Sequence, residues 1–187
     1  MRTLIVYYSH DGSTELVAKA LAEAAGCDVR RLEDKSPRNG MAGPGLAALL
    51  HISAKLVHPD FDVAGYDTVV ILGPIWAGNP TPAVNTFLRN VHLTGKKVLL
   101  VTVSAGPDNA KAAARLELMA KAREGEVIGV RQVHGKLPLI SEHKSVRQGH
   151  DRTPSTTLTS ATDGELRDAG IALAEELGHM ADSLTEE

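Results

Sequence analysis

The stretch Leu4-Ile-Val-Tyr-Tyr-Ser-His-Asp-Gly-Ser-Thr14 decides the fold of this chain. Its first five residues are aliphatic or aromatic and predict a buried strand. Apolar residues recur at helical spacing directly after it, at Leu16, Val17, Ala20, Leu21 and Ala24. The loop between strand and helix is rich in hydroxyl side chains, and it points backbone N–H groups and the positive end of a helix dipole at one spot. That spot suits a phosphate group.

The alternation of strand and helix continues along the chain. Further strands are predicted over residues 27–32, 68–73, 98–103 and 127–133, and further helices over residues 44–58, from 82, over 110–123 and from 163. Such alternation gives a parallel sheet with helices on both faces. The first, third and fourth strand segments are the most apolar, so we expect them at the centre of the sheet. The sequence therefore predicts an α/β fold with a doubly wound five-stranded parallel sheet, in the order 2-1-3-4-5.

Length and composition restrict the kinds of protein that this chain can be. The 187 residues predict a single domain over 1–187. A net charge of −3 does not favour nucleic acid, and no run of about 18 apolar residues predicts a membrane span. No signal-peptide pattern is present, so we expect the cytoplasm. The single cysteine, Cys27, excludes an internal disulfide, and no spacing of ligands predicts a metal site.

Residues 136–162 stand apart from this pattern. They are irregular and rich in Ser and Thr, and they exceed the usual connection length of about 12–15 residues. We interpret them as a long loop or an insertion. The basic residues within it leave four interpretations open: a solvated loop, a lid, a contact in a homodimer and a nicotinamide-phosphate site.

The predicted topology indicates where a ligand binds. In an open doubly wound sheet, ligands bind beyond the carboxyl ends of the strands, where the winding direction reverses. For this order the point lies between strands one and three, where the loops 9–14, 74–81 and 104–109 meet. The second loop carries Trp76, the single tryptophan. A phosphate loop beside a flat apolar ring indicates a phosphorylated planar cofactor.

Two segments resemble the flavodoxin family. Ser9-His-Asp-Gly-Ser-Thr14 resembles the loop that binds the FMN phosphate there, usually Thr/Ser-x-Thr-Gly-x-Thr, and Gly73-Pro-Ile-Trp-Ala-Gly-Asn-Pro-Thr-Pro82 resembles the isoalloxazine loop. The resemblance covers roughly residues 1–135, and the last helix also fits it. It implies FMN as cofactor. The cofactor-binding residues expected from it are Ser9, His10, Asp11, Gly12, Ser13, Thr14, Pro74, Ile75, Trp76, Ala77, Gly78, Asn79, Ser104, Ala105, Gly106 and Asp108.

Two departures from the family pattern bear on this expectation. Asp11 stands where the pattern has Thr, and a carboxylate aimed at a phosphate repels it. Asp11 must therefore point away, be protonated, or weaken binding. The third loop also has no aromatic residue, which leaves one face of a bound flavin open to a second substrate.

The resemblance implies an FMN-binding redox protein that transfers electrons through the bound flavin. Two roles stay open: an electron carrier for a partner protein, and an enzyme that takes hydride from NAD(P)H and reduces a quinone-type acceptor. No side chain is assigned as catalytic. A receiver domain is disfavoured because strands three and five end Leu72-Gly73-Pro74 and Val133-His134, without the required aspartate and lysine, and no G-x-S-x-G elbow indicates a hydrolase. A flavin-free interaction module of the same fold remains an alternative.

Overall fold

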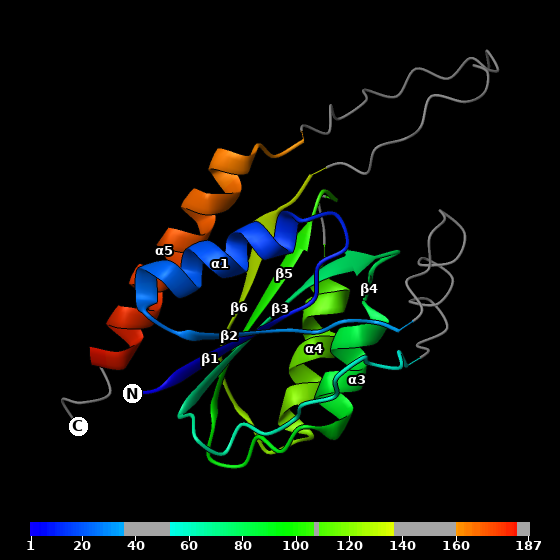
Figure 1. Ribbon diagram of the computed structural model, residues 1–187, viewed down its shortest axis with the longest axis vertical. Helices are drawn as coiled ribbons and strands as arrows, with labels where there is room; N and C mark the ends of the chain where they lie inside the picture. Colours follow the sequence, from blue (N-terminus) through cyan, green and yellow to red (C-terminus); the bar gives the residue numbers. More distant parts are fainter. Residues whose placement is uncertain (36–52, 107–108, 137–159, 183–187) are drawn as a thin grey trace.

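The computed structural model describes residues 1–35, 53–106, 109–136 and 160–182 (Figure 1). Its main sheet is built from five parallel strands in the order β2-β1-β3-β5-β6. Their bounds are β1 Thr3–Tyr7, β2 Asp28–Arg31, β3 Thr68–Trp76, β5 Lys97–Ser104 and β6 Glu126–His134. Numbered along the chain without the short β4, these strands have the order 2-1-3-4-5. The predicted α/β fold and sheet order are confirmed.

Helices cover both faces of this sheet. They are α1 Ser13–Ala25, α3 Pro82–Asn90, α4 Ala110–Lys121 and α5 Asp163–Asp182. In Figure 1, α1 and α5 lie on one face, and α3 and α4 lie on the other. Each face has its own core because successive residues of a strand point to opposite sides. Leu4 of β1 packs in the core with Phe87 of α3, whereas Ile5 packs in the core with Leu21 of α1 and Leu166 of α5.

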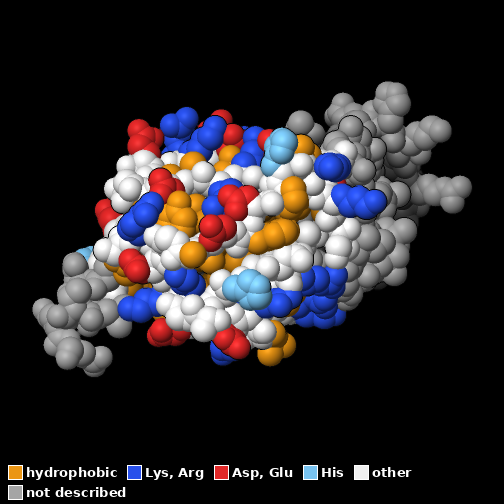
Figure 2. All heavy atoms as spheres, turned by 60° about the horizontal axis from the view of Figure 1, so that its bottom comes forward, with side chains coloured by type: hydrophobic (Ala, Val, Ile, Leu, Met, Phe, Trp, Pro, Cys, Tyr) orange, Lys and Arg blue, Asp and Glu red, His pale blue; other side chains and the backbone are white. Residues whose placement is uncertain are grey.

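The face drawn in Figure 2 carries both acidic and basic side chains around smaller apolar areas. Over most of it the two kinds are interspersed, and beside the grey atoms on the right the charged side chains are basic. This mixture agrees with the small net charge of −3.

The segment after β3 differs from the predicted loop. β3 continues to Trp76 and pairs antiparallel with a two-residue strand, β4 (Asn79–Pro80). Ala77 and Gly78 form the turn between them, and both have positive φ, 48° and 71°. Two consecutive residues with positive φ are typical of a tight hairpin turn. The ring of Trp76 is therefore carried by the end of a strand and not by an irregular loop.

The predicted helix over 44–58 is wrong in the part that the structure describes. Residues 53–58 are not helical, and Leu56 forms an isolated antiparallel bridge with Asp34. Ala54 and Leu56 are both buried. Two buried apolar residues two positions apart are typical of an extended segment. In the sequence they also fit the helical spacing of the longer apolar pattern, and this led to the prediction of a helix. The remainder of this predicted helix lies outside the described residues, and so do residues 137–159 of the predicted loop or insertion. The single domain stays a prediction.

Candidate functional site

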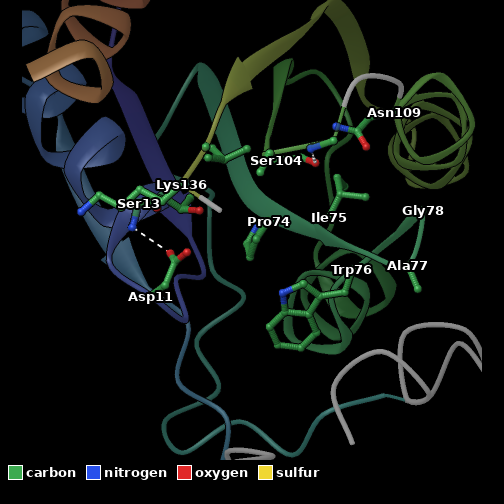
Figure 3. Close-up of a pocket in the computed structure, with 15 residues that line it drawn as sticks. Asp11, Ser13, Pro74, Ile75, Trp76, Ala77, Gly78, Ser104, Asn109 and Lys136 are labelled. Carbon is green, nitrogen blue, oxygen red and sulfur yellow. Dashed lines mark hydrogen bonds between the residues drawn. The ribbon is translucent and has the colours of Figure 1, made fainter. Parts of the chain in front are cut away.

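A pocket of about 370 Å³ lies at the carboxyl ends of the central strands (Figure 3). Its wall comes from the three segments that the topology predicts to meet there, together with the end of β6. Eleven of the predicted site residues line it: Asp11, Ser13, Thr14, Pro74, Ile75, Trp76, Ala77, Gly78, Ser104, Ala105 and Gly106. The strand order thus brings together three segments that are far apart in the chain, from Asp11 to Gly106.

Four predicted site residues support the pocket without lining it. The Ser9 hydroxyl accepts the Gly12 N–H at 3.1 Å and so shapes the loop from within. Gly12 precedes α1 with a φ of 90°, in the left-handed conformation that glycine adopts readily. The side chain of Asn79 donates to the carbonyl of Ala77 at 3.0 Å. His10 is exposed and packs against Trp76. The remaining predicted site residue, Asp108, lies outside the described residues.

Four residues that line the pocket are absent from the predicted set: Val103, Asn109, Gly135 and Lys136. Asn109 ends the third loop, and its burial depends on the packing of α4, which a single sequence does not reveal. Gly135 and Lys136 directly follow β6, so the rule that parallel strands end at one edge could have located them. The irregular sequence beyond β6 concealed this signal.

Unpaired buried polar groups are the main chemical feature of the pocket. Ser13 and Thr14 are 3% and 1% exposed, and Asn109 is 5% exposed. Among the described residues, no partner accepts or donates a hydrogen bond at Ser13 Oγ, Thr14 Oγ1 or Asn109 Nδ2. Leaving such a buried group unpaired costs about 1–3 kcal/mol. A polar ligand in the pocket would pair these groups, and a purely apolar one would not.

The two hydroxyls lie at the N-terminal end of α1. Ser13 and Thr14 are the first two residues of this 13-residue helix, whose initial N–H groups have no partner within the helix. The positive end of the helix dipole adds to the attraction for an anion. Two hydroxyl donors and N–H groups that the helix itself does not pair form, at one point, a site for an anionic group such as a phosphate.

Asp11 lines the same pocket, so the carboxylate that departs from the family pattern lies at the candidate phosphate site. Its Oδ1 accepts the Ser13 N–H at 2.9 Å, as the dashed line in Figure 3 shows. The carboxylate therefore already pairs one of the N–H groups that an anion would use. Lys136 also lines the pocket, and its ammonium forms an ion pair with Asp163 at the start of α5.

An aromatic ring forms the opposite side of the pocket. In Figure 3, Asp11 and the indole of Trp76 lie on either side of it. Tyr8 and His10 hold this indole edge-on, with ring centroids 5.8 Å and 5.4 Å away and interplanar angles of 82° and 85°. Such edge-to-face contacts fix the orientation of a ring. The third segment contributes Ser104, Ala105 and Gly106, all small residues, so the described part of this wall has no second aromatic ring.

The described ranges contain neither a metal centre nor a membrane-spanning helix. No three His, Cys, Asp or Glu side chains gather there as they would around a metal ion. None of the described helices combines the length and the apolar character that crossing a membrane requires.

Comparison with known proteins gives matches in structure and none in sequence. No protein-family model and no curated protein sequence matches the chain. A candidate flavoprotein from Bacteroides uniformis is 22% identical, with a TM-score of 0.64 over 72% of this chain and 90% of that one. A flavoprotein from Lactobacillus acidophilus, solved in complex with FMN, is 22% identical, with a TM-score of 0.57 over 70% of this chain and 92% of that one.

A third similar structure spans almost the whole chain. It is a flavodoxin from Streptococcus pneumoniae, 16% identical, with a TM-score of 0.53 over 96% of this chain and 99% of that one. At such identities the likeness concerns the fold. Strand order, the layering of the helices and these neighbours agree: the chain has the flavodoxin-like fold.

Proposed function

We propose that the pocket binds FMN and that the protein transfers electrons through it. The observation that carries this proposal is the set of three buried, unpaired polar groups on Ser13, Thr14 and Asn109, which line one pocket with Trp76. FMN combines an anionic phosphate, polar ring edges and a flat aromatic system. The phosphate and the polar edges could pair with the unpaired groups of the pocket, and the flat ring system could lie against Trp76. The pocket volume of about 370 Å³ is within the range of about 300–1,000 Å³ for small-molecule sites.

The residues of the pocket divide the tasks of binding. Ser13, Thr14 and the start of α1 would hold the phosphate, and Trp76 would lie against the ring system. Asn109 would donate to a polar atom of the cofactor. FMN supplies the electron-transfer chemistry when bound, and the protein positions it and controls access. The flavoprotein from Lactobacillus acidophilus that binds FMN has the same fold, which supports this assignment.

A titration with FMN tests the proposal directly. Trp76 is the single tryptophan, so its fluorescence reports on the pocket alone. We expect FMN to quench this fluorescence in a saturable manner and to co-elute with the protein in gel filtration, with the visible bands of a bound flavin. If the fluorescence does not change and no flavin co-elutes, the proposal is wrong.

Two threonines provide a matched pair of variants. Thr14 and Thr81 are both buried, at 1% and 0% exposure, and both have an unpaired hydroxyl among the described residues. Only Thr14 lines the pocket. Replacing Thr14 by Val removes one hydrogen bond to the phosphate, so we expect the FMN dissociation constant to rise about tenfold. Thr81→Val should leave it unchanged. Equal effects of the two variants would place the phosphate elsewhere.

A second role is favoured by the small side chains of Ser104, Ala105 and Gly106. They leave room beside the cofactor, so a small acceptor such as a quinone, or NAD(P)H, could reach it. An electron carrier would instead pass electrons to a partner protein. We place the protein in the cytoplasm in either role. Stopped-flow mixing of the FMN-loaded protein with NADPH distinguishes them. Rapid loss of the flavin absorbance supports the oxidoreductase, and its absence supports the carrier.

A further inference from the structure

Asp11 places a negative charge inside the proposed phosphate site. Its Oδ1 lies 2.9 Å from the backbone nitrogen of Ser13, and Asp11 lines the pocket beside the buried hydroxyls of Ser13 and Thr14. These two hydroxyls have no partner among the described residues, so the site is built for a polar group. The carboxylate uses one N–H of this site and leaves the two hydroxyls unused.

The neighbouring charges do not offset this carboxylate. Lys136 is the cation among the described pocket-lining residues, and its ammonium pairs with Asp163. Glu15 in the first turn of α1 adds a second acidic group, which pairs with Lys19 at 2.7 Å and with Arg31 at 3.1 Å. A phosphate monoester carries a charge of about −1.5 to −2 at pH 7. It would therefore enter a pocket whose lining carries one carboxylate, Asp11, and one ammonium, Lys136, that is already paired with Asp163.

We propose that Asp11 determines the ligand specificity of the site, by occupying the phosphate position in the free protein and repelling a phosphate in the loaded one. This inference rests on the proposed binding of FMN in the same pocket. The phosphate must displace Asp11 from the Ser13 N–H, or share the loop with it. Asp11 therefore reduces the contribution of the phosphate to the binding free energy. As a result, it makes the affinity for FMN more similar to that for riboflavin, which has the same ring system and no phosphate.

The ratio of two dissociation constants isolates this effect. We would measure the binding of FMN and of riboflavin by quenching of Trp76 fluorescence, for the wild type and for Asp11→Asn. The asparagine keeps an oxygen that accepts the Ser13 N–H and removes only the charge. Repulsion between a carboxylate and a phosphate a few ångströms apart in water corresponds to about a factor of ten. We expect FMN to bind about tenfold more tightly to Asp11→Asn, and riboflavin to bind as it does to the wild type.

A second variant tests the occupation of the N–H group. Asp11→Ala removes the charge and also frees the Ser13 N–H, so its gain in FMN affinity should be at least as large as that of Asp11→Asn. Asp62→Asn is the matched control. Asp62 Oδ1 accepts the Ala64 N–H at 2.9 Å, the same local bond, in the segment that precedes β3 and hence at the opposite end of the sheet. This control should not change the binding of either flavin.

The outcomes separate this inference from the function on which it rests. If both flavins bind but Asp11→Asn leaves the FMN constant within twofold, or shifts the two flavins equally, Asp11 has no role in specificity and FMN binding stands. If neither flavin quenches Trp76 in the wild type or in either Asp11 variant, the proposed function is wrong, and the role of Asp11 is rejected with it.

Discussion

At the scale of single residues, the turn between β3 and β4 combines strain with a place in the pocket. Ala77 has a φ of 48°, which residues with a Cβ rarely adopt, and Gly78 follows with 71°. A residue other than glycine in this conformation costs about 1–2 kcal/mol. The Asn79 side chain binds the Ala77 carbonyl, and Trp76 pairs with Asn79 across the turn, so these contacts hold the turn in place.

Replacing Gly78 by Ala would add a second strained residue to this turn. No atom lies within 4 Å of the position of a new Cβ, so the effect comes from the backbone conformation alone. We expect the free energy of unfolding in urea to fall by about 1 kcal/mol. Gly106→Ala is the control, because Gly106 lines the same pocket without a positive φ and its new Cβ would make only an ordinary contact with Ser104, at 3.5 Å. A loss of stability as large in the control would contradict this explanation.

At the scale of secondary structure elements, α5 begins with a reciprocal pair of hydrogen bonds. The Thr162 N–H donates to Glu165 Oε2 at 2.7 Å, and the Glu165 N–H donates to Thr162 Oγ1 at 3.3 Å. This capping box pairs N–H groups that the helix itself leaves unpaired. The hydrogen bond from the Thr162 backbone, and next that from its hydroxyl, lower the pKa of the Glu165 carboxyl below its usual 4.5.

This shift predicts how the stability changes with pH. Because the pKa of Glu165 is lower in the folded state, the ionised carboxylate stabilises the fold above pH 4.5, and the contribution is lost as the pH falls through the folded value. We expect Glu165→Gln to be less stable than the wild type at pH 7 and to approach it at pH 3.5, when both are unfolded in urea. In Thr162→Ala part of the difference should remain at pH 3.5, because this variant also removes the hydroxyl that accepts the Glu165 N–H at every pH. A difference that is equal at both pH values would exclude the carboxylate as its source.

The sequence predicts the elements best where one period dominates. The apolar runs of β3 and β5 and the spacing in α3 locate these elements, and the order of the sheet follows from their apolar character. Prediction from the sequence fails where the pattern of apolar residues is short. The hairpin at Ala77-Gly78 has no Asn-Gly or Asp-Gly signal, and Leu56 fits a helix and an extended segment equally well until its packing is known.

At the scale of the whole molecule, the candidate site depends on contacts between distant segments. The three predicted loops meet because the winding reverses between β1 and β3, a consequence of strand order that the sequence reveals. The burial of Asn109 and the ion pair of Lys136 with Asp163 are not encoded in any local pattern. The ion pair also links the pocket to α5, so the placement of this helix against α1 affects the site.

Gly170 permits α5 to pack closely against α1. A Cβ at this position would lie 2.6 Å from the carbonyl oxygen of Val17 and 3.0 Å from the amide nitrogen of Leu21, and neither backbone atom can move without displacing α1. We expect Gly170→Ala to lower the free energy of unfolding by about 2 kcal/mol or more. Gly178→Ala on the same helix meets nothing within 4 Å and should raise it by about 0.5–1 kcal/mol, because alanine favours a helix. Urea unfolding of the two variants checks this, and a Gly170→Ala protein as stable as Gly178→Ala would contradict the close packing of the two helices.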